Sequence, residues 1–123
     1  MFKNLSQFKK NIKAGDVVKI YNKMRSIGIE KRVVIKVQTN CIITGIEISE
    51  DEYNSSVSSV QKINDKYYKL IWLKFEKAKH MKFNDNKVEY LAYMKQPSYG
   101  NPIMSPSPDF KEGETWLTLT VER

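Results

Sequence analysis

The chain has 123 residues, 41% of them hydrophobic, and a formal net charge of +7. A chain of this length can bury one core and not two, so we expect a single domain over residues 1–123. With one histidine, His80, and one cysteine, Cys41, the sequence excludes a Cys/His metal cluster and an internal disulfide, and no apolar run is long enough to span a bilayer.

A short helix is predicted near the start of the chain. Apolar residues recur at spacings of three and four from Phe2 to Ile12, which is the period of a helix with one buried face. Asn4 stands where a side-chain cap is favoured, and Gly15 can adopt the positive φ that ends a helix. The pattern therefore predicts a helix over residues 5–13 that lays its apolar face on the rest of the protein.

From residue 16 onward the apolar period changes from that of a helix to that of a strand. Strands are predicted over residues 17–20, 32–37 and 42–48, and together they read as an antiparallel meander. In the second of these, alternation predicts that Val33, Ile35 and Val37 are buried while Arg32 lies on a basic outer face. Gly45 indicates a bulge or a close approach of a neighbour, either of which helps a small sheet to curl.

The second half of the chain continues the strand pattern, with two polar interruptions. Residues 50–59 are too hydrophilic for a core element and are predicted to be a loop, whereas residues 66–75 are apolar on both faces and predict a central strand. Residues 84–86 are a credible hairpin tip. Four prolines within residues 96–109 predict a long loop, and residues 115–121 predict a closing strand, which at an edge of the sheet could pair with a second copy.

These elements predict an α+β protein in which an N-terminal helix packs on a strongly bent, mainly antiparallel β-sheet. Roughly five to seven strands are expected, and a small SH3-like or OB-like barrel is one form that such a sheet can take. Because one fold serves many functions, the architecture alone does not identify the activity.

Charge is distributed in alternating blocks along the chain. Residues 1–40 hold 10 basic and 2 acidic groups, residues 41–65 hold 1 and 5, residues 66–99 hold 8 and 3, and residues 100–123 hold 2 and 4. Charge that is segregated along a chain often becomes segregated over a surface, which gives a field able to steer a polyanion or an acidic protein. Lysine supplied for solubility, or by an AT-rich genome, would give the same composition.

Two groups of residues are candidates for binding, because cations that track phosphates and rings that stack on bases suit nucleic acid. The first group is Lys9, Lys10, Lys13, Lys31, Arg32 and Lys36. The second group is Tyr67, Lys69, Lys74, Lys77, Lys79 and His80. The alternative for both groups is structural: lysines that cover a solvated face, and aromatic residues that belong to the core.

Catalytic motifs are missing from the sequence. Glu76 lies four residues before His80 and could assist it as a general base, but no nucleophile elbow and no Gly-rich phosphate loop is present. A nuclease built from carboxylates alone could draw on Asp16, Glu47, Asp85 and Glu89, although no spacing singles them out. We therefore expect a protein without catalysis, cofactor or metal, and hold a small nuclease or transferase as a minor alternative.

The proline-rich segment carries the apolar residues Tyr99, Ile103 and Met104, which a purely solvated loop would not need. These residues either dock a protein partner or cover one end of the core. They give the sequence a second class of partner to set beside nucleic acid.

The function predicted from the sequence is that of a small basic module that binds nucleic acid, either DNA or RNA. The alternative is a small protein-binding inhibitor or accessory factor, of bacterial or mobile-element origin, that uses its basic face against an acidic protein surface. The first residues carry charge with no apolar segment behind them, which argues against a secretory leader. We expect a cytoplasmic protein with no membrane partner, and the pattern leaves the oligomeric state open.

Overall fold

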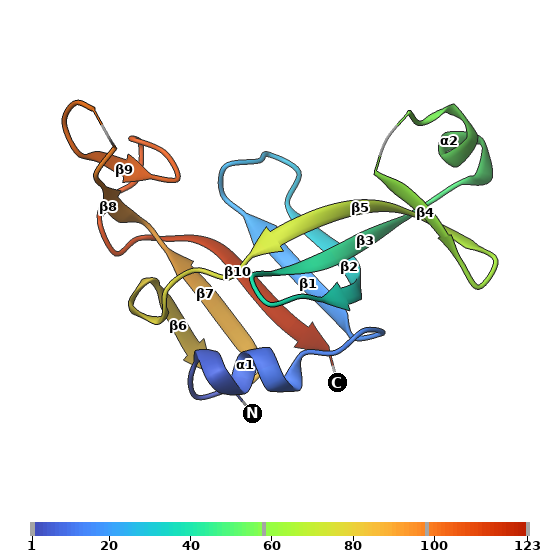
Figure 1. Cartoon of the computed structure of the whole chain (residues 1–123), viewed down its shortest axis with the longest axis horizontal. Helices are drawn as coiled ribbons and strands as arrows, with labels where there is room; N and C mark the ends of the chain where they lie inside the picture. The colour runs from blue at the N-terminus through green and yellow to red at the C-terminus, as the bar shows by residue number, and fades with distance from the viewer. Residues whose placement is uncertain (1, 58, 98, 123) are drawn as a thin grey trace.

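The computed structural model describes residues 2–57, 59–97 and 99–122 (Figure 1). In chain order its elements are α1 (Leu5–Asn11), β1 (Val17–Asn22), β2 (Ile29–Val37), β3 (Cys41–Ile48), α2 (Glu50–Ser55), β4 (Val60–Ile63), β5 (Lys66–Lys74), the 3₁₀ helix η1 (Ala78–His80), β6 (Met81–Asn84), β7 (Lys87–Leu91), β8 (Tyr93–Lys95), β9 (Ile103–Ser105) and β10 (Thr115–Glu122).

Most of the strands form one bent sheet. Its eight strands lie in the order β4-β5-β3-β2-β1-β10-β7-β6, and every pair of neighbours is antiparallel. β8 and β9 form a separate two-stranded sheet. The prediction of an α+β fold on a mainly antiparallel sheet is confirmed, with more strands than expected. The sheet does not close into a barrel, because β4 and β6 remain its two edges.

Helix α1 lies across the concave side of the sheet (Figure 1). As predicted, the Asn4 side chain caps it by accepting a hydrogen bond from the Gln7 amide. The helix ends at Asn11, two residues before the predicted end. The ring of its buried residue Phe8 packs on two others. Its centroid lies 5.7 Å from that of Phe75, which follows β5, and 6.1 Å from that of Phe83 in β6. One helical side chain thus joins two distant parts of the sheet.

Strand β2 buries the opposite face from the one that the sequence predicts. Arg32 and Val34 are 4% and 1% exposed, whereas Val33 and Ile35 lie only partly buried on the other side. The register between β2 and β3 shifts between Val34 and Lys36, so that Val37 returns to the core side. Alternation identifies two faces but does not say which is inside, and the pairing with β1 and β3 decides that.

Gly45 marks a close approach of residues from the two neighbouring strands, which was one of the two predicted possibilities. A Cβ atom at this position would lie 3.0 Å from Ile35 Cδ1 and 3.1 Å from Tyr68 Cβ. The nearby irregularity is in the partner strand β2 and not at the glycine itself. The glycine therefore lets side chains of β2 and β5 approach across β3.

The segment predicted as a loop over residues 50–59 contains helix α2. Ser49 accepts a hydrogen bond from the Glu52 amide, and the first helical turn carries Glu50, Asp51 and Glu52, where the helix dipole favours acids. Tyr53 packs on Tyr67 of β5, with ring centroids 4.7 Å apart. The prediction of a loop was wrong because the Ser-x-x-Glu cap can start a short helix even in a polar segment.

Two predictions about the chain's last third also need correction. The proline-rich segment is not a continuous loop, because β9 pairs with β8 to form an arm that projects from the sheet (Figure 1). β10 is not an edge strand, because it lies between β1 and β7 and has no free side for a second copy. The hairpin tip at residues 84–86 is confirmed as the tight connection between β6 and β7.

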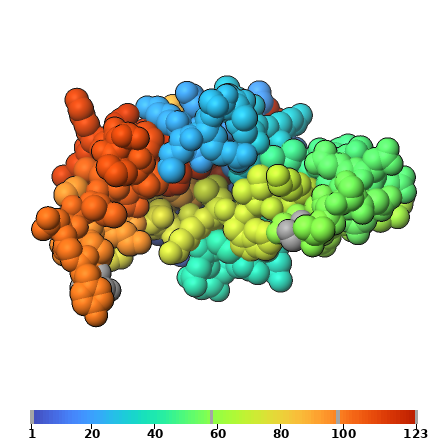
Figure 2. Space-filling view, turned by 90° about the horizontal axis from the view of Figure 1, so that it is seen from above, coloured from blue at the N-terminus to red at the C-terminus, as the bar shows by residue number. Residues whose placement is uncertain are grey.

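The arm and α2 lie at opposite ends of the molecule (Figures 1 and 2). Figure 2 also shows the β1–β2 loop beside the orange and red segment that follows the arm. Lys23 and Met24 of this loop share a surface hollow with Ser107, Asp109 and Phe110. The acidic helix packs on the start of β5 through Tyr53 and Tyr67, whereas Lys74 lies at the opposite end of that strand.

Candidate functional site

The first predicted group of cations does not form one patch. Lys10, Lys13 and Lys36 are exposed on α1, after α1 and near the end of β2. Lys31 lies beside Lys19 in the register of β1 and β2, on the face of the sheet that is turned away from the core. The structure therefore distributes this group over separate surfaces.

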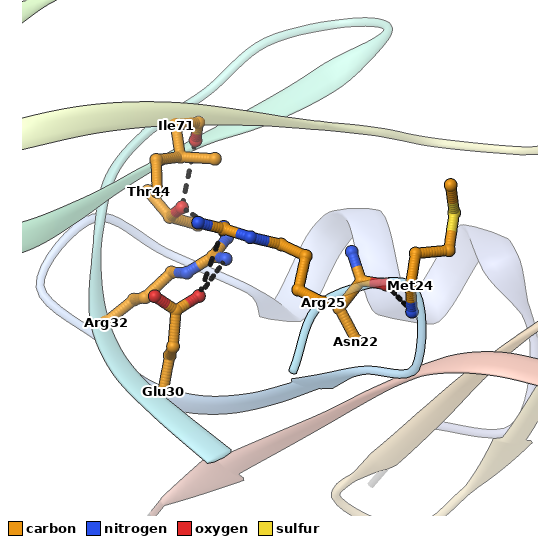
Figure 3. Close-up of polar contacts among 7 residues, drawn as sticks. All are labelled: Asn22, Met24, Arg25, Glu30, Arg32, Thr44 and Ile71. Atoms are coloured by element: carbon orange, nitrogen blue, oxygen red, sulfur yellow. Dashed lines mark hydrogen bonds and ion pairs between the residues drawn. The ribbon is translucent and has the colours of Figure 1, made fainter. Parts of the chain in front are cut away.

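Arg32 is not placed for the predicted phosphate contact, because its side chain is buried. Its Nη2 donates to Glu30 Oε1 at 2.6 Å and its Nη1 donates to Thr44 Oγ1 at 3.3 Å (Figure 3). The Thr44 hydroxyl in turn donates to the carbonyl of Ile71 at 2.9 Å. Arg25 approaches the same Glu30 oxygen at 3.6 Å from the β1–β2 loop. We call Arg25, Glu30, Arg32 and Thr44 the arginine cluster.

Most of the second predicted group lines a cleft of about 470 Å³. Its walls come from the end of β5, from η1 with the residues that precede it, and from β8. We call this cleft the lysine cleft. Its basic residues are Lys74, Lys77, Lys79, Lys95 and His80. Among the residues that the structure describes, the cleft has one carboxylate, Glu76, and its remaining lining residues are Phe75, Tyr93, Met94 and Gln96.

A lysine of the first group, on helix α1, contacts one residue of this cleft. The ammonium group of Lys9 lies 5.0 Å from the centroid of the Phe75 ring, and Phe75 is one of the cleft residues. A cation over an aromatic face is attracted by the ring quadrupole. The two lysine-rich segments of the chain therefore meet at Phe75, although Lys9 is not itself a lining residue of the cleft.

The lysines of the cleft are exposed and carry unneutralised charge. All four of its lysine side chains are exposed to solvent. Within the part of the chain that the structure describes, none of these four forms an ion pair. An excess of cations in a concave surface focuses positive potential and raises the local concentration of anions.

His80 is held in place by its neighbours in the cleft. Its ring stacks on that of Tyr93 at 3.9 Å with an interplanar angle of 11°, and the Tyr93 hydroxyl donates to Glu76 at 3.4 Å. Burial and then the positive charge of Lys79 lower the pKa of His80 from its usual value. The imidazole of the unliganded protein is therefore harder to protonate than a solvated histidine, and a bound anion would favour its protonation.

Tyr67 and Lys69 of the second group lie at the other end of β5, away from the cleft. Tyr67 packs on Tyr53 of α2, and the ammonium group of Lys62 lies 5.7 Å from its ring centroid. Its ring belongs to the contact between α2 and the sheet. Lys69 is exposed opposite Val60 of β4.

The predicted partner-binding residues all lie in the arm: Ile103 and Met104 belong to β9, and Tyr99 belongs to the connection between β8 and β9. Tyr99 is 91% exposed and Ile103 is 54% exposed, while Met104 is half-buried opposite Met94. The prediction missed Tyr93 and Lys95, which join the cleft through β8. The sequence signal was the short segment of aromatic, apolar and basic residues directly before Pro97, which is too brief to be recognised without its partner strand.

The candidate carboxylates of a nuclease have other contacts. Glu47 lies 3.6 Å from Lys66, and Glu89 accepts a hydrogen bond from Thr115 at 3.2 Å. Among the described residues, no three His, Cys, Asp or Glu side chains gather in a way that could hold a metal ion. In the same residues, no helix combines the length and the apolarity that a membrane crossing requires.

Comparison with known proteins finds no match to a family model, to a curated protein or to a solved structure.

Proposed function

We propose that the protein binds nucleic acid, without catalysis, in the lysine cleft. The observation that carries this proposal is the convergence of four exposed lysines and His80 around a cleft with one carboxylate. Lys9 of α1 adds a further cation over Phe75, one of the cleft residues. A polyanion is the partner that such an arrangement favours, because each neutralised phosphate releases a counterion.

The shape and the lining of the cleft also support a nucleic acid over a small anion. A cleft of about 470 Å³ with four separate cations can follow several linked phosphates, whereas a single small anion would engage only part of the set. Tyr93 and the exposed Met94 add apolar surface beside the cations. This mixture suits a chain of phosphates with bases or sugars attached.

The proposal is tested by fluorescence anisotropy with labelled DNA and RNA oligomers, single-stranded and duplex, at about 50 mM salt, where phosphate contacts act most strongly. The test variant combines Lys74→Gln, Lys77→Gln and Lys79→Gln. The control variant has the same net charge and combines Lys3→Gln, Lys62→Gln and Lys111→Gln, all exposed and outside the cleft. We expect the cleft variant to lose roughly tenfold or more in affinity, and the control to lose much less.

Two results would overturn the proposal. One is an absence of binding by the wild-type protein at low salt to every oligomer. The other is an equal loss of affinity in the cleft variant and in the control, which would show that total charge and not the cleft controls binding.

A second candidate function, binding to an acidic protein surface as an inhibitor or accessory factor, is favoured by the arm. Tyr99, Met94 and Ile103 expose 91%, 48% and 54% of their surfaces, and large exposed apolar groups are typical of docking sites. Co-purification with and without nuclease separates the two functions. A protein partner should survive the digestion and be lost on Ile103→Asp, whereas a polynucleotide should not survive.

A further inference from the structure

A second basic surface lies on the outer face of the sheet, which is the side of β2, β1, β10 and β7 turned away from the core. The register places Lys31, Lys19, Thr120 and Lys87 in one row across these four strands. All three lysines of the row are exposed. No residue of this row belongs to the lysine cleft.

An apolar pair lies directly beside the row of lysines. Tyr21 and Ile29 face each other across β1 and β2, and they are 45% and 67% exposed. They share a shallow hollow of about 390 Å³ with Lys19, Lys87, Thr118 and Thr120. The neighbouring residue Ile20 is only 1% exposed, which confirms that Tyr21 points away from the core.

The hollow combines the groups that a nucleotide needs. The face of Tyr21 and the side chain of Ile29 offer a surface for a base, and the hydroxyls of Thr118 and Thr120 can donate and accept hydrogen bonds. The lysine row lies two residues away along the strands, or about 7 Å, on the side where phosphates of the same strand can reach it. A duplex would not fit this chemistry, because its bases stack on each other and present no face to a ring.

We propose that the outer face is a second nucleic-acid site that binds a single strand, with a base on Tyr21 and phosphates along Lys31, Lys19 and Lys87. That the ligand is a nucleic acid rests on the proposed function. The residues that would bind it on the outer face are not those of the lysine cleft. The three lysines favour a polyanion by charge complementarity. The exposed ring of Tyr21 favours a polyanion whose bases are accessible.

Base recognition is tested with two labelled oligomers of about ten nucleotides, one of thymidine and one of abasic sites, which has the same phosphates without bases. We expect the wild-type protein to prefer the thymidine oligomer by roughly 5- to 150-fold, the range given by stacking on one ring. Tyr21→Thr should remove most of this preference and Tyr21→Phe should retain it. Threonine and phenylalanine are both favoured in β-strands, so we expect both variants to fold. Thermal unfolding followed by circular dichroism checks this.

The outcomes separate this inference from the proposed function. If Tyr21→Thr leaves the preference for bases unchanged, or if the protein does not distinguish the two oligomers, the outer face is not a nucleotide site. The variant of the lysine cleft should keep the preference while it loses total affinity. If Tyr21→Thr lowers the preference for bases and the cleft variant leaves the total affinity unchanged, the outer face is supported as a binding site and the lysine cleft is not.

The phosphate contacts have their own test at Lys19. Glu122 pairs with Lys19 at 2.9 Å, and this hydrogen bond lowers the pKa of the carboxyl from its usual value. Glu122→Gln removes a negative charge from the margin of the row and should strengthen binding of both oligomers about two- to fivefold. Lys87→Gln should weaken both. Unchanged binding in both variants would exclude the row as a phosphate track.

Discussion

The arginine cluster and the lysine cleft carry the same sign of charge and have opposite relations to solvent. In the cluster, Arg32 is 4% exposed and its guanidinium is bound to Glu30 and Thr44. In the cleft, Lys74, Lys77 and Lys79 are exposed and form no ion pair within the described residues. A buried and paired cation is already bound to groups of the fold, whereas an exposed and unpaired one remains available to a ligand.

The difference follows the chemistry of the two side chains. A planar guanidinium offers several donors in a fixed geometry and can satisfy a carboxylate and a hydroxyl at once, which suits a buried position. A lysine ammonium is strongly hydrated on a flexible stem, which suits a solvated cleft. A count of basic residues therefore says less about binding than their burial does.

The largest effect is expected from Arg32→Ala, which should lower the free energy of unfolding by about 3 kcal/mol. The substitution leaves the carboxylate of Glu30 without its closest partner and opens a cavity beside Thr44. Urea unfolding followed by circular dichroism measures the change. A loss below about 1 kcal/mol would show that the cluster is not a structural element.

The lysine cleft should show the opposite behaviour. The combined Lys74→Gln, Lys77→Gln and Lys79→Gln variant should keep its unfolding free energy to within about 0.5 kcal/mol, as expected for exposed sites. Its binding to single strands should become less sensitive to salt, because each lost phosphate contact reduces the slope by about 0.7. Between about 50 and 200 mM salt, the wild-type protein should lose about 20-fold more affinity than the variant. If the affinities of the two proteins depend equally on salt, the three lysines do not contact phosphates.

A smaller effect is expected from the titration of His80. Burial and Lys79 lower the pKa of the unliganded imidazole, Lys77 lowers it further, and Glu76 and Glu112 oppose the shift. A polyanion favours the protonated ring, so binding takes up a proton and affinity should rise as the pH falls through the lowered pKa. Between pH 8 and pH 5.5 we expect roughly fivefold tighter binding, the size of one added ionic contact of about 1 kcal/mol.

The His80 measurement needs a matched variant because carboxylates also titrate at low pH. His80→Gln keeps a polar side chain and removes the titration, so its affinity should change less over the same range. A pH profile that is identical in the two proteins would place His80 outside the site.

The smallest effect is expected from Arg25→Ala. Arg25 approaches the same carboxylate as Arg32 but is 45% exposed and lies 3.6 Å away, so solvent screens the pair. The unfolding free energy should fall by about 0.5 kcal/mol or less. A loss as large as that of Arg32→Ala would mean that the two arginines act as one unit.

The parts of the fold that the sequence predicted correctly are those with a local signal. The Asn4 cap, the period of α1 and the alternation of Leu117, Leu119 and Val121 in β10 all depend on residues that are close in the chain. The same local reasoning failed at α2, where the cap signal of Ser49 and Glu52 was present but outweighed by polarity. It also could not show that β10 lies between β1 and β7.

The candidate site was predicted in part for the same reason. Lys74, Lys77, Lys79 and His80 are close in sequence, and the turn around η1 keeps them together. Lys95 reaches them through a strand that exists only in its pairing with β9. Tyr67 was predicted as a stacking residue, but its ring packs on α2, a helix that the prediction did not contain.

The sequence by itself determined the fold class, helix α1, the hairpin tip at residues 84–86 and the alternation of charge along the chain, because these depend on period, caps and neighbours. The tertiary structure alone decided which face of β2 is buried and which cations meet. Arg32 lies inside, where Thr44 and Glu30 bind its two terminal nitrogens, and Lys9 lies over Phe75 because the adjacent Phe8 packs against the same ring. Contacts between residues distant in the chain depend on strand register and packing, which no local pattern records.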